Sequence, residues 1–236
     1  MIVTGVSNPG WTFTLERMKQ IKILFDFLSK KEEWEVYNYK EMQREATKFN
    51  EVLNPSKIRM FIPWFERFGI LRFNKDVKLY GELLTKLGKD FVGFCSVYVE
   101  VMNNEEKYTQ DQIHDVSEAF CAFIYKFYEN VMNSDRGSLY RQIIISLEKH
   151  NYLTREEFFI LTTKIETGES EQWLDEKILS FRRGELTIDP KKIKNQNAYG
   201  YIIPFCCEAG ITIIDKEKRI LPDRHKYFEG ALAHVK

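Results

Sequence analysis

Three short stretches combine carboxylates with a lysine, which is the residue pattern of a metal-dependent nuclease centre: Glu105-Glu106-Lys107, Asp175-Glu176-Lys177 and Asp215–Lys218. In such a centre the clustered carboxylates, usually following a strand, bind a divalent ion and position a water molecule. The first stretch lies in a polar linker, the second on a predicted surface helix, and the third at the tip of a predicted hairpin. We therefore predict that this chain has no nuclease centre.

Other catalytic and metal-binding patterns are missing from the sequence. The histidines form no HxxxH or HExxH pair, and there is no phosphate-binding glycine loop and no GxSxG nucleophile turn. The four cysteines contain no CxxC pair, which argues against a zinc site or a disulfide scaffold and suits a reducing compartment. We predict no metal and no cofactor in this chain.

The composition predicts a folded chain whose total charge does not reveal a partner. The chain has 236 residues, 44% of them apolar and 14% aromatic, which predicts one or two domains with a substantial core. The 35 basic and 35 acidic residues cancel, so a nucleic-acid surface requires local segregation of charge. The N-terminus lacks a signal-peptide pattern, and no apolar run reaches the roughly 18–20 residues of a membrane span. We expect a cytoplasmic protein without a membrane partner.

Two stretches do segregate positive charge. Residues 54–78 carry six basic and two acidic residues, and residues 181–194 carry five basic and two acidic ones. Lysine and arginine are expected to neutralise phosphates there, and amide side chains pair with adenine edges in a major groove. A solvated loop explains either stretch alone, but their equivalent positions in the chain favour DNA. The predicted contacts are Asn54, Ser56, Lys57, Arg59 and Lys75, and then Lys191, Lys192, Lys194, Asn195, Gln196, Asn197 and Tyr199.

The spacing of apolar residues locates the elements that must position these side chains. In the first half, helices are predicted over residues 15–28, 40–50, 55–68 and 83–94. Asn54 and Pro55 form an N-cap and first turn, and Gly69 ends the third helix. Alternating apolar residues within 70–80 predict a hairpin with Lys75 at its tip.

The second half also places helices before a hairpin. The helices are predicted over residues 109–132, 139–149, 155–165, 171–183 and 199–209. Residues 211–222 predict the hairpin, with Lys216 at its tip. Residues 1–13 are interpreted as an extended arm, which Asn8-Pro9-Gly10 punctuates and which Trp11 and Phe13 anchor.

An internal repeat links the two halves. FIPWFERFGI at residues 61–70 and IIPFCCEAGI at residues 202–211 share Ile-Pro-aromatic, with Gly-Ile starting six residues after the proline. Each precedes a predicted hairpin, so we interpret the chain as mainly α with short β-hairpin wings, in two tandem winged helix-turn-helix subdomains. The predicted domains are residues 1–105 and residues 106–236, the second beginning with the long connecting helix. The alternative is two unrelated helix-to-hairpin junctions.

Several segments resemble the N-terminal half of AlwI-type restriction and nicking endonucleases. They are RMFIPWFERFGILRFN (residues 59–74), LLTKLGKDF (residues 83–91) and YLTREEFFILTTKIETGESEQWLDEKILSFR (residues 152–182). The Asn-Pro-Gly that precedes an amphipathic helix resembles the opening of the FokI recognition domain. The resemblance implies tandem winged-helix subdomains that read an asymmetric DNA site. It also implies a separate C-terminal PD-(D/E)xK domain that cuts outside the site with magnesium.

The sequence thus predicts specific recognition of double-stranded DNA for a type IIS-like restriction or nicking endonuclease. Because the matching segments end before a nuclease, cleavage and its magnesium are expected only from an attached domain or a separate subunit. A transcription regulator that dimerises through residues 109–132 is one alternative. Another is a protein-interaction module anchored by Phe61, Trp64 and Phe65. A cryptic nuclease, revealed by magnesium-dependent cleavage, is a third.

Overall fold

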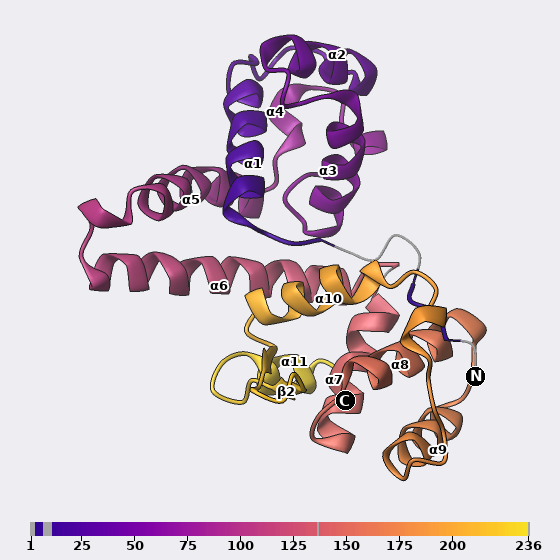
Figure 1. Ribbon diagram of the computed structural model, residues 1–236. Coiled ribbons are helices and arrows are strands. Elements are labelled where there is room, and N and C mark those ends of the chain that lie inside the picture. The colour runs from indigo at the N-terminus through magenta and orange to yellow at the C-terminus, as the bar shows by residue number, and fades with distance from the viewer. Residues whose placement is uncertain (1–2, 7–10, 136, 236) are drawn as a thin grey trace. The chain divides into compact units, whose positions relative to one another are not determined.

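The chain is mainly helical, and its described part contains one pair of antiparallel strands (Figure 1). The computed structural model describes residues 3–6, 11–135 and 137–235. The predicted Asn8-Pro9-Gly10 punctuation of the arm lies outside these residues. None of the described helices is both long and apolar enough to cross a membrane.

Two compact units make up the chain. The first unit consists of residues 13–130, and the second unit consists of residues 1–12 and 131–236. The predicted boundary between residues 105 and 106 therefore falls inside the first unit.

The first unit contains the three predicted N-terminal helices, and its fifth helix is longer than predicted. Its α-helices are α1 (Leu15–Leu28), α2 (Tyr39–Phe49), α3 (Pro55–Arg67), α4 (Tyr80–Leu83), α5 (Lys86–Asn103) and α6 (Gln110–Met132), and its 3₁₀ helices are η1 (Asn74–Asp76) and η2 (Glu105–Lys107). The N-cap side chains of α1, α2, α3 and α5 accept backbone N–H groups, which satisfies donors that a helix start leaves unpaired.

Phenylalanine rings hold the core of the first unit together and draw α6 into it. The ring of Phe127 on α6 lies 4.8 Å from that of Phe91 on α5 and 5.3 Å from that of Phe68. Phe13 lies 5.8 Å from Phe127, so it anchors the chain before α1 as predicted. Each fully buried Phe contributes about 1.5–3 kcal/mol. This shared core explains why the unit extends past η2.

The hairpin predicted at residues 70–80 is wrong. Leu71 instead forms a single antiparallel bridge with Leu84, and Leu79 forms one with Val36. Between them, the Glu66 carboxylate accepts the Asn74 N–H at 2.7 Å and favours the 3₁₀ turn η1.

A second carboxylate also prevents the hydrogen-bond ladder of the predicted hairpin. Glu82 accepts the backbone N–H groups of Lys78 and Leu79 at 2.9 and 3.1 Å. These donors are then unavailable to a neighbouring strand. Lys75 is exposed, but on a 3₁₀ turn instead of a hairpin tip.

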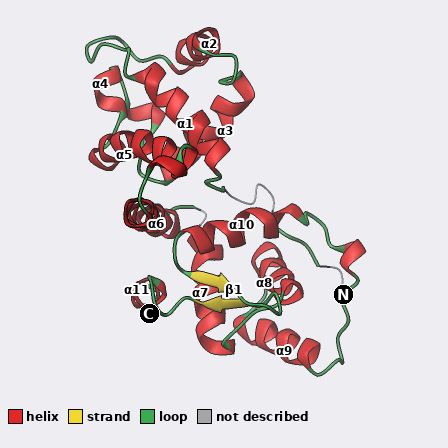
Figure 2. Cartoon of the chain, turned by 60° about the vertical axis from the view of Figure 1, so that its left-hand side comes forward, coloured by secondary structure: helices red, strands yellow, loops and turns green. Residues whose placement is uncertain are grey.

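The second unit contains the predicted helices and the predicted hairpin. Its elements are α7 (Gly137–His150), α8 (Arg155–Thr167), α9 (Glu171–Arg182), η3 (Pro190–Lys192), α10 (Asn197–Glu208), β1 (Thr212–Ile214), β2 (Ile220–Pro222) and α11 (Phe228–Ala233). Ile213 pairs with Leu221 across the two strands (Figure 2). Lys216 is exposed at the hairpin tip, as predicted. The short helix α11 was not predicted.

Candidate nucleic-acid interface

The repeat seen in the sequence is also a repeat of local structure. Both α3 and α10 continue through an internal proline, Pro63 and Pro204. Each helix then ends at a glycine with positive φ, +72° at Gly69 and +64° at Gly210. The isoleucine that follows donates its N–H back into the helix, at 2.9 Å in the first unit and 3.0 Å in the second. These are the hydrogen bonds of a glycine-terminated helix.

A helix upstream of each repeat helix also begins alike, although α2 directly precedes α3 whereas α9 lies between α8 and α10. Val36 lies just before α2 and bridges Leu79, which follows α3. Leu153 lies just before α8 and bridges Ile220, which follows α10. In both units, then, an extended residue pairs with the segment that returns after the repeat helix.

The predicted contacts of the first unit gather on the first turns of α3. Asn54 is the N-cap, and its side chain accepts the Lys57 N–H at 3.0 Å. Ser56 and Arg59 are exposed, and Lys57 is half-buried. Among the described residues, neither Lys57 nor Arg59 forms an ion pair. Their charge is therefore available to an anion.

A shallow groove of about 370 Å³ lies between the middle of α3 and the turn that carries Lys75. Its lining consists of Tyr39, Ile62, Pro63, Glu66, Phe73, Asn74 and Lys75. Phe73 is 55% exposed. Burial raises the pKa of the Tyr39 phenol, and the nearby charge of Arg59 opposes that rise. Sequence reasoning missed Tyr39 and Phe73, because only the fold brings them beside α3.

In the second unit the exposed lysines precede α10. Lys191 and Lys192 lie on η3, and Lys194 follows them. Lys192 reaches Asp189 at 4.0 Å, with four-fifths of its side chain exposed, and such a pair contributes little. Lys191 and Lys194 have no ion pair within the described part of the chain.

The rest of the 181–194 stretch does not supply free charge. Arg182 donates to the Glu157 carboxylate at 2.6 Å. Arg183 pairs with Glu185 at 2.8 Å, and this contact lowers the pKa of Glu185. Near α10, the positive charge of this stretch therefore comes from residues 191–194.

The predicted amide readers have different surroundings. Asn195 has φ +51° and donates its side-chain N–H to the Gly5 carbonyl at 3.0 Å. Gln196 donates to the Pro190 carbonyl, also at 3.0 Å. Asn197 begins α10 and is exposed. The amides of Asn195 and Gln196 thus hold the backbone, although both residues are exposed like Asn197.

Arg155 belongs to this surface and was missed by sequence reasoning. It is the first residue of α8, and its guanidinium lies 5.9 Å from the centre of the Tyr199 ring. It also donates to the Gln196 side-chain oxygen at 3.4 Å. Tyr199 itself packs edge-to-face on Phe158 at 5.5 Å. The capping box of Thr154 and Glu157 was the available signal, because it places the half-buried Arg155 on the first turn of α8.

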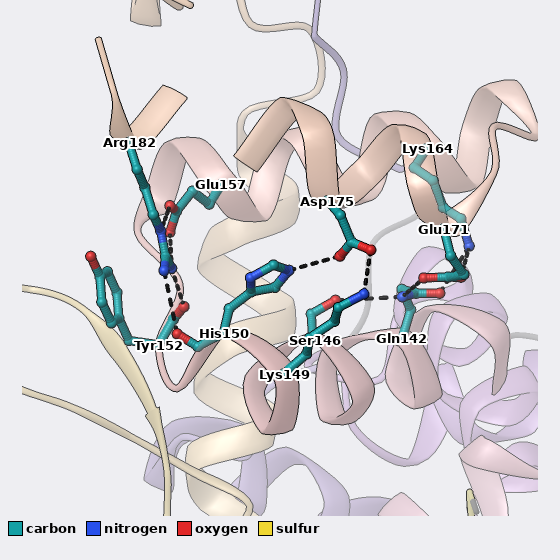
Figure 3. A network of polar contacts seen from close by, with 10 residues as sticks. All are labelled: Gln142, Ser146, Lys149, His150, Tyr152, Glu157, Lys164, Glu171, Asp175 and Arg182. Carbon is teal, nitrogen blue, oxygen red and sulfur yellow. Dashed lines mark hydrogen bonds and ion pairs between the residues drawn. The ribbon is translucent and has the colours of Figure 1, made fainter. Parts of the chain in front are cut away.

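A network of polar side chains lies behind this surface, between α7, α8 and α9 (Figure 3). Glu157 is fully buried and binds Arg182, which also donates to the Tyr152 carbonyl at 2.8 Å. His150 contacts Asp175 at 3.1 Å. Burial lowers the pKa of His150, and the Asp175 charge opposes this change.

The charges in this network neutralise one another. Lys149 binds Asp175, and Lys164 binds Glu171. Gln142 joins the second pair through its amide. We interpret the network as a clamp that fixes α8, and therefore Arg155, relative to α7 and α9.

The three carboxylate–lysine stretches are not assembled into one centre. Glu105–Lys107 forms η2 in the first unit. Asp175 is occupied by Lys149 and His150, and Asp215 by Arg219 at 2.7 Å. Within the described ranges, no group of three or more His, Cys, Asp or Glu side chains is placed to hold a metal ion.

Each surface taken by itself places cations on exposed turns, with hydroxyl and amide groups beside them, which is chemistry that suits an anion. Each surface lies at the start of a repeat helix, in a different unit of the chain. No family model, curated protein or solved structure matches the chain.

Proposed function

We propose that the chain recognises double-stranded DNA through α3 and α10, each acting as the recognition helix of a winged helix-turn-helix. Their matched ends and the matched bridges before α2 and α8 support this arrangement. In helix-turn-helix proteins the N-terminal residues of the recognition helix meet base edges in the major groove. The turn at η1 and the β1–β2 hairpin take the places of the two wings.

Unpaired cations beside both recognition helices are the observation that carries the proposal. Lys57 and Arg59 lie on α3, and Lys191, Lys194 and Arg155 surround the start of α10. Elsewhere in the same units, Lys31 and Arg224 are held by carboxylates, whereas Lys40 and Lys216 are exposed and have no ion pair among the described residues. Free cations clustered at two equivalent places are what phosphate binding requires.

We assign the proposed contacts to three roles. Lys191, Lys192 and Lys194 are exposed and hold phosphates. Arg59 and Asn197 project from the first turns of their helices and read bases, since both side chains form bidentate hydrogen bonds to base edges. Asn54, Asn195 and Gln196 support the backbone through the bonds described above.

We further propose that this recognition serves a type IIS-like restriction or nicking endonuclease. The resemblance of residues 59–74 and 152–182 to AlwI-type enzymes supports this assignment. Cleavage is then supplied by a fused or separate PD-(D/E)xK nuclease that binds magnesium. The asymmetry of the site distinguishes this role from that of a dimeric regulator, which reads a palindrome.

Selection from a pool of randomised duplex DNA at physiological salt tests the proposal. We expect enrichment of one short asymmetric motif. A palindrome instead indicates a regulator dimer. Absence of enrichment, with binding abolished at modest salt, refutes specific recognition and favours protein interaction.

The alternative function, a protein-interaction module, needs a different anchor from the one predicted. Phe61, Trp64 and Phe65 are at most 3% exposed, so they are core residues. Trp34 and Val36, between α1 and α2, are 73% and 77% exposed and would take over that role.

Substitution of the α3 cations gives the first direct prediction. Arg59→Ala removes a charge and a base contact, so we expect the affinity for the selected motif to fall by about 1–3 kcal/mol. Lys57→Ala removes a phosphate contact and lowers the salt dependence of binding by a slope of about 0.9. Fluorescence anisotropy across a salt series measures both.

Lys86→Ala is the matched control, because Lys86 is an exposed lysine of the same unit that pairs with Asp90 on α5. We expect it to bind like the wild type. Equal affinity of Arg59→Ala and Lys86→Ala at moderate salt would show that α3 does not read DNA.

A further inference from the structure

We propose that residues 3–6 act as a strut that holds residues 190–195, the basic loop, in the conformation that binds DNA. The inference rests on the proposed function and concerns what positions the second DNA surface. The strut lies beside α8 and the chain that leads into α10 (Figure 1). The two segments are far apart in sequence but belong to the same unit.

The backbones of the strut and the basic loop pair through one parallel bridge. Thr4 bridges Lys194, which donates its N–H to the Val3 carbonyl at 3.1 Å. Gly5 donates its N–H to the Lys194 carbonyl at 2.8 Å. The peptide groups on both sides of Lys194 are therefore fixed, while its side chain stays exposed.

The other side of the strut is fastened to α8. Thr4 donates its N–H to the Thr163 hydroxyl at 2.9 Å, and its carbonyl accepts from Thr162 at 2.8 Å. Val3 and Val6 are buried, at 1% and 6% exposure. The strut thus fixes the basic loop relative to α8. Without it, the three neighbouring lysines would lie on an irregular backbone with no such support.

Gly5 is the point of closest approach. A Cβ atom there would lie 2.4 Å from the Asn195 carbonyl oxygen and 2.7 Å from the Ala198 Cβ. Atoms do not approach so closely, so any larger residue must separate the strut from the loop. Asn195 adopts φ +51°, a conformation that costs a residue other than glycine about 1 kcal/mol or more. Its side-chain bond to Gly5 compensates for that cost.

Holding the loop in advance raises affinity, because less ordering free energy is then spent when DNA binds. Lys191, Lys192 and Lys194 can present up to three charges to phosphates at fixed spacing. A released loop no longer has this arrangement, although it keeps every charge. Release of the loop should therefore weaken DNA binding, and specifically the part of the binding that depends on these three lysines.

Gly5→Ala tests the strut. We expect DNA affinity to fall, and the slope of log K against log salt to shrink by about 0.9 for each phosphate that the loop no longer neutralises. Amide hydrogen exchange at Gly5 and Lys194 should accelerate in the same variant. Gly93→Ala is the control, because a Cβ at Gly93 meets nothing within 4 Å, and it should bind DNA like the wild type.

A double-mutant cycle separates positioning from general damage. In a background with all three loop lysines changed to alanine, Gly5→Ala should cause no further decrease in DNA affinity, since it acts only through them. Equal decreases in both backgrounds would overturn the inference. So would unchanged affinity in a variant whose loop exchange has accelerated.

Two further results complete the test. If the wild type binds no DNA, the proposed function and the strut's role both fail; if it binds DNA and Gly5→Ala binds equally, only the strut fails. Should Gly5→Ala not fold, Thr163→Val keeps the shape of the side chain and removes the hydroxyl that accepts from Thr4. It should lower affinity and the salt slope in the same direction by a smaller amount.

Discussion

At the scale of single residues, the same side-chain type has opposite roles depending on its partners. Arg182 and Arg155 both lie in the second unit, but Arg182 is bound to the buried Glu157 and Arg155 is bound to no carboxylate in the described part of the chain. A count of charges along the sequence places Arg182 in a basic stretch. Only the fold shows that its charge is neutralised by Glu157, because Glu157 lies 25 positions away in the sequence.

Site residues were predictable where local rules apply and unpredictable where distant groups decide. The place of Asn54 before Pro55 predicts an N-cap, and the structure confirms it. Asn195 has the side chain of a base reader, but that side chain is bonded to Gly5, 190 residues away. No pattern within a short window reports such a bond.

His150 gives a prediction about pH at this scale. Its pKa is lowered by burial, so the unfolded chain binds a proton more readily than the folded one. Its contribution to stability is fully present above the ordinary histidine pKa of about 6.5 and is lost as the pH falls through the lower folded value. The slope contributed by one such group is at most about 1.4 kcal/mol per pH unit.

Urea unfolding between neutral and mildly acidic pH measures this effect. His150→Gln should reduce the loss of stability on acidification. The control, His225→Gln, changes an exposed histidine of the same unit and should keep the wild-type slope. Identical slopes in the two variants would show that His150 is not the group responsible.

At the scale of elements, helices were predictable because their signals are local. Apolar periodicity and capping residues lie within the element that they define, and most predicted helices agree with the observed bounds to within a few residues. The helix predicted over residues 83–94 is the exception, because α5 begins at Lys86 and continues to Asn103. The first hairpin failed for the opposite reason. Glu66 and Glu82 occupy the backbone donors of the return segment from outside the alternating pattern. The second hairpin, where Ile213 faces Leu221, was predicted correctly.

The end of α3 gives the prediction for this scale. Gly69 has φ +72°, and a Cβ there would lie 2.6 Å from the Asn130 side-chain nitrogen. That nitrogen donates to the Phe68 carbonyl at 2.7 Å. Gly69→Ala should therefore destabilise the chain by about 1–2 kcal/mol from the backbone alone, and more if the Asn130 bond breaks.

Denaturant unfolding compares Gly69→Ala with Gly93→Ala. Gly93 lies inside α5, where alanine is favoured by about 0.5–1 kcal/mol and meets no neighbour within 4 Å. The two Gly-to-Ala changes should have opposite signs. A stabilising Gly69→Ala would mean that the helix end does not need the left-handed conformation.

At the scale of the whole molecule, the chain consists of two units. Both contain the same kind of repeat helix, but different residues pack around it in each unit. The first unit packs its repeat helix over phenylalanine rings such as Phe91 and Phe127. The second fastens the approach to its repeat helix with the strut and a polar clamp around Glu157. The repeat in the sequence predicts two subdomains. It could not predict that residues 3–6 join the second one, since that pairing joins groups more than 150 positions apart in the sequence.

Because the two proposed DNA surfaces belong to separate units and share no residue, their contributions should be independent. Changes at sites without shared partners add within about 0.5 kcal/mol. The decrease in DNA affinity in Arg59→Ala combined with Asn197→Ala should therefore equal the sum of the single decreases. Each single variant should also relax the preference at its own part of the motif, as measured by repeating the selection from randomised DNA. If both variants relax the same positions, α3 and α10 do not read separate halves of one site, and the tandem arrangement proposed for this chain is wrong.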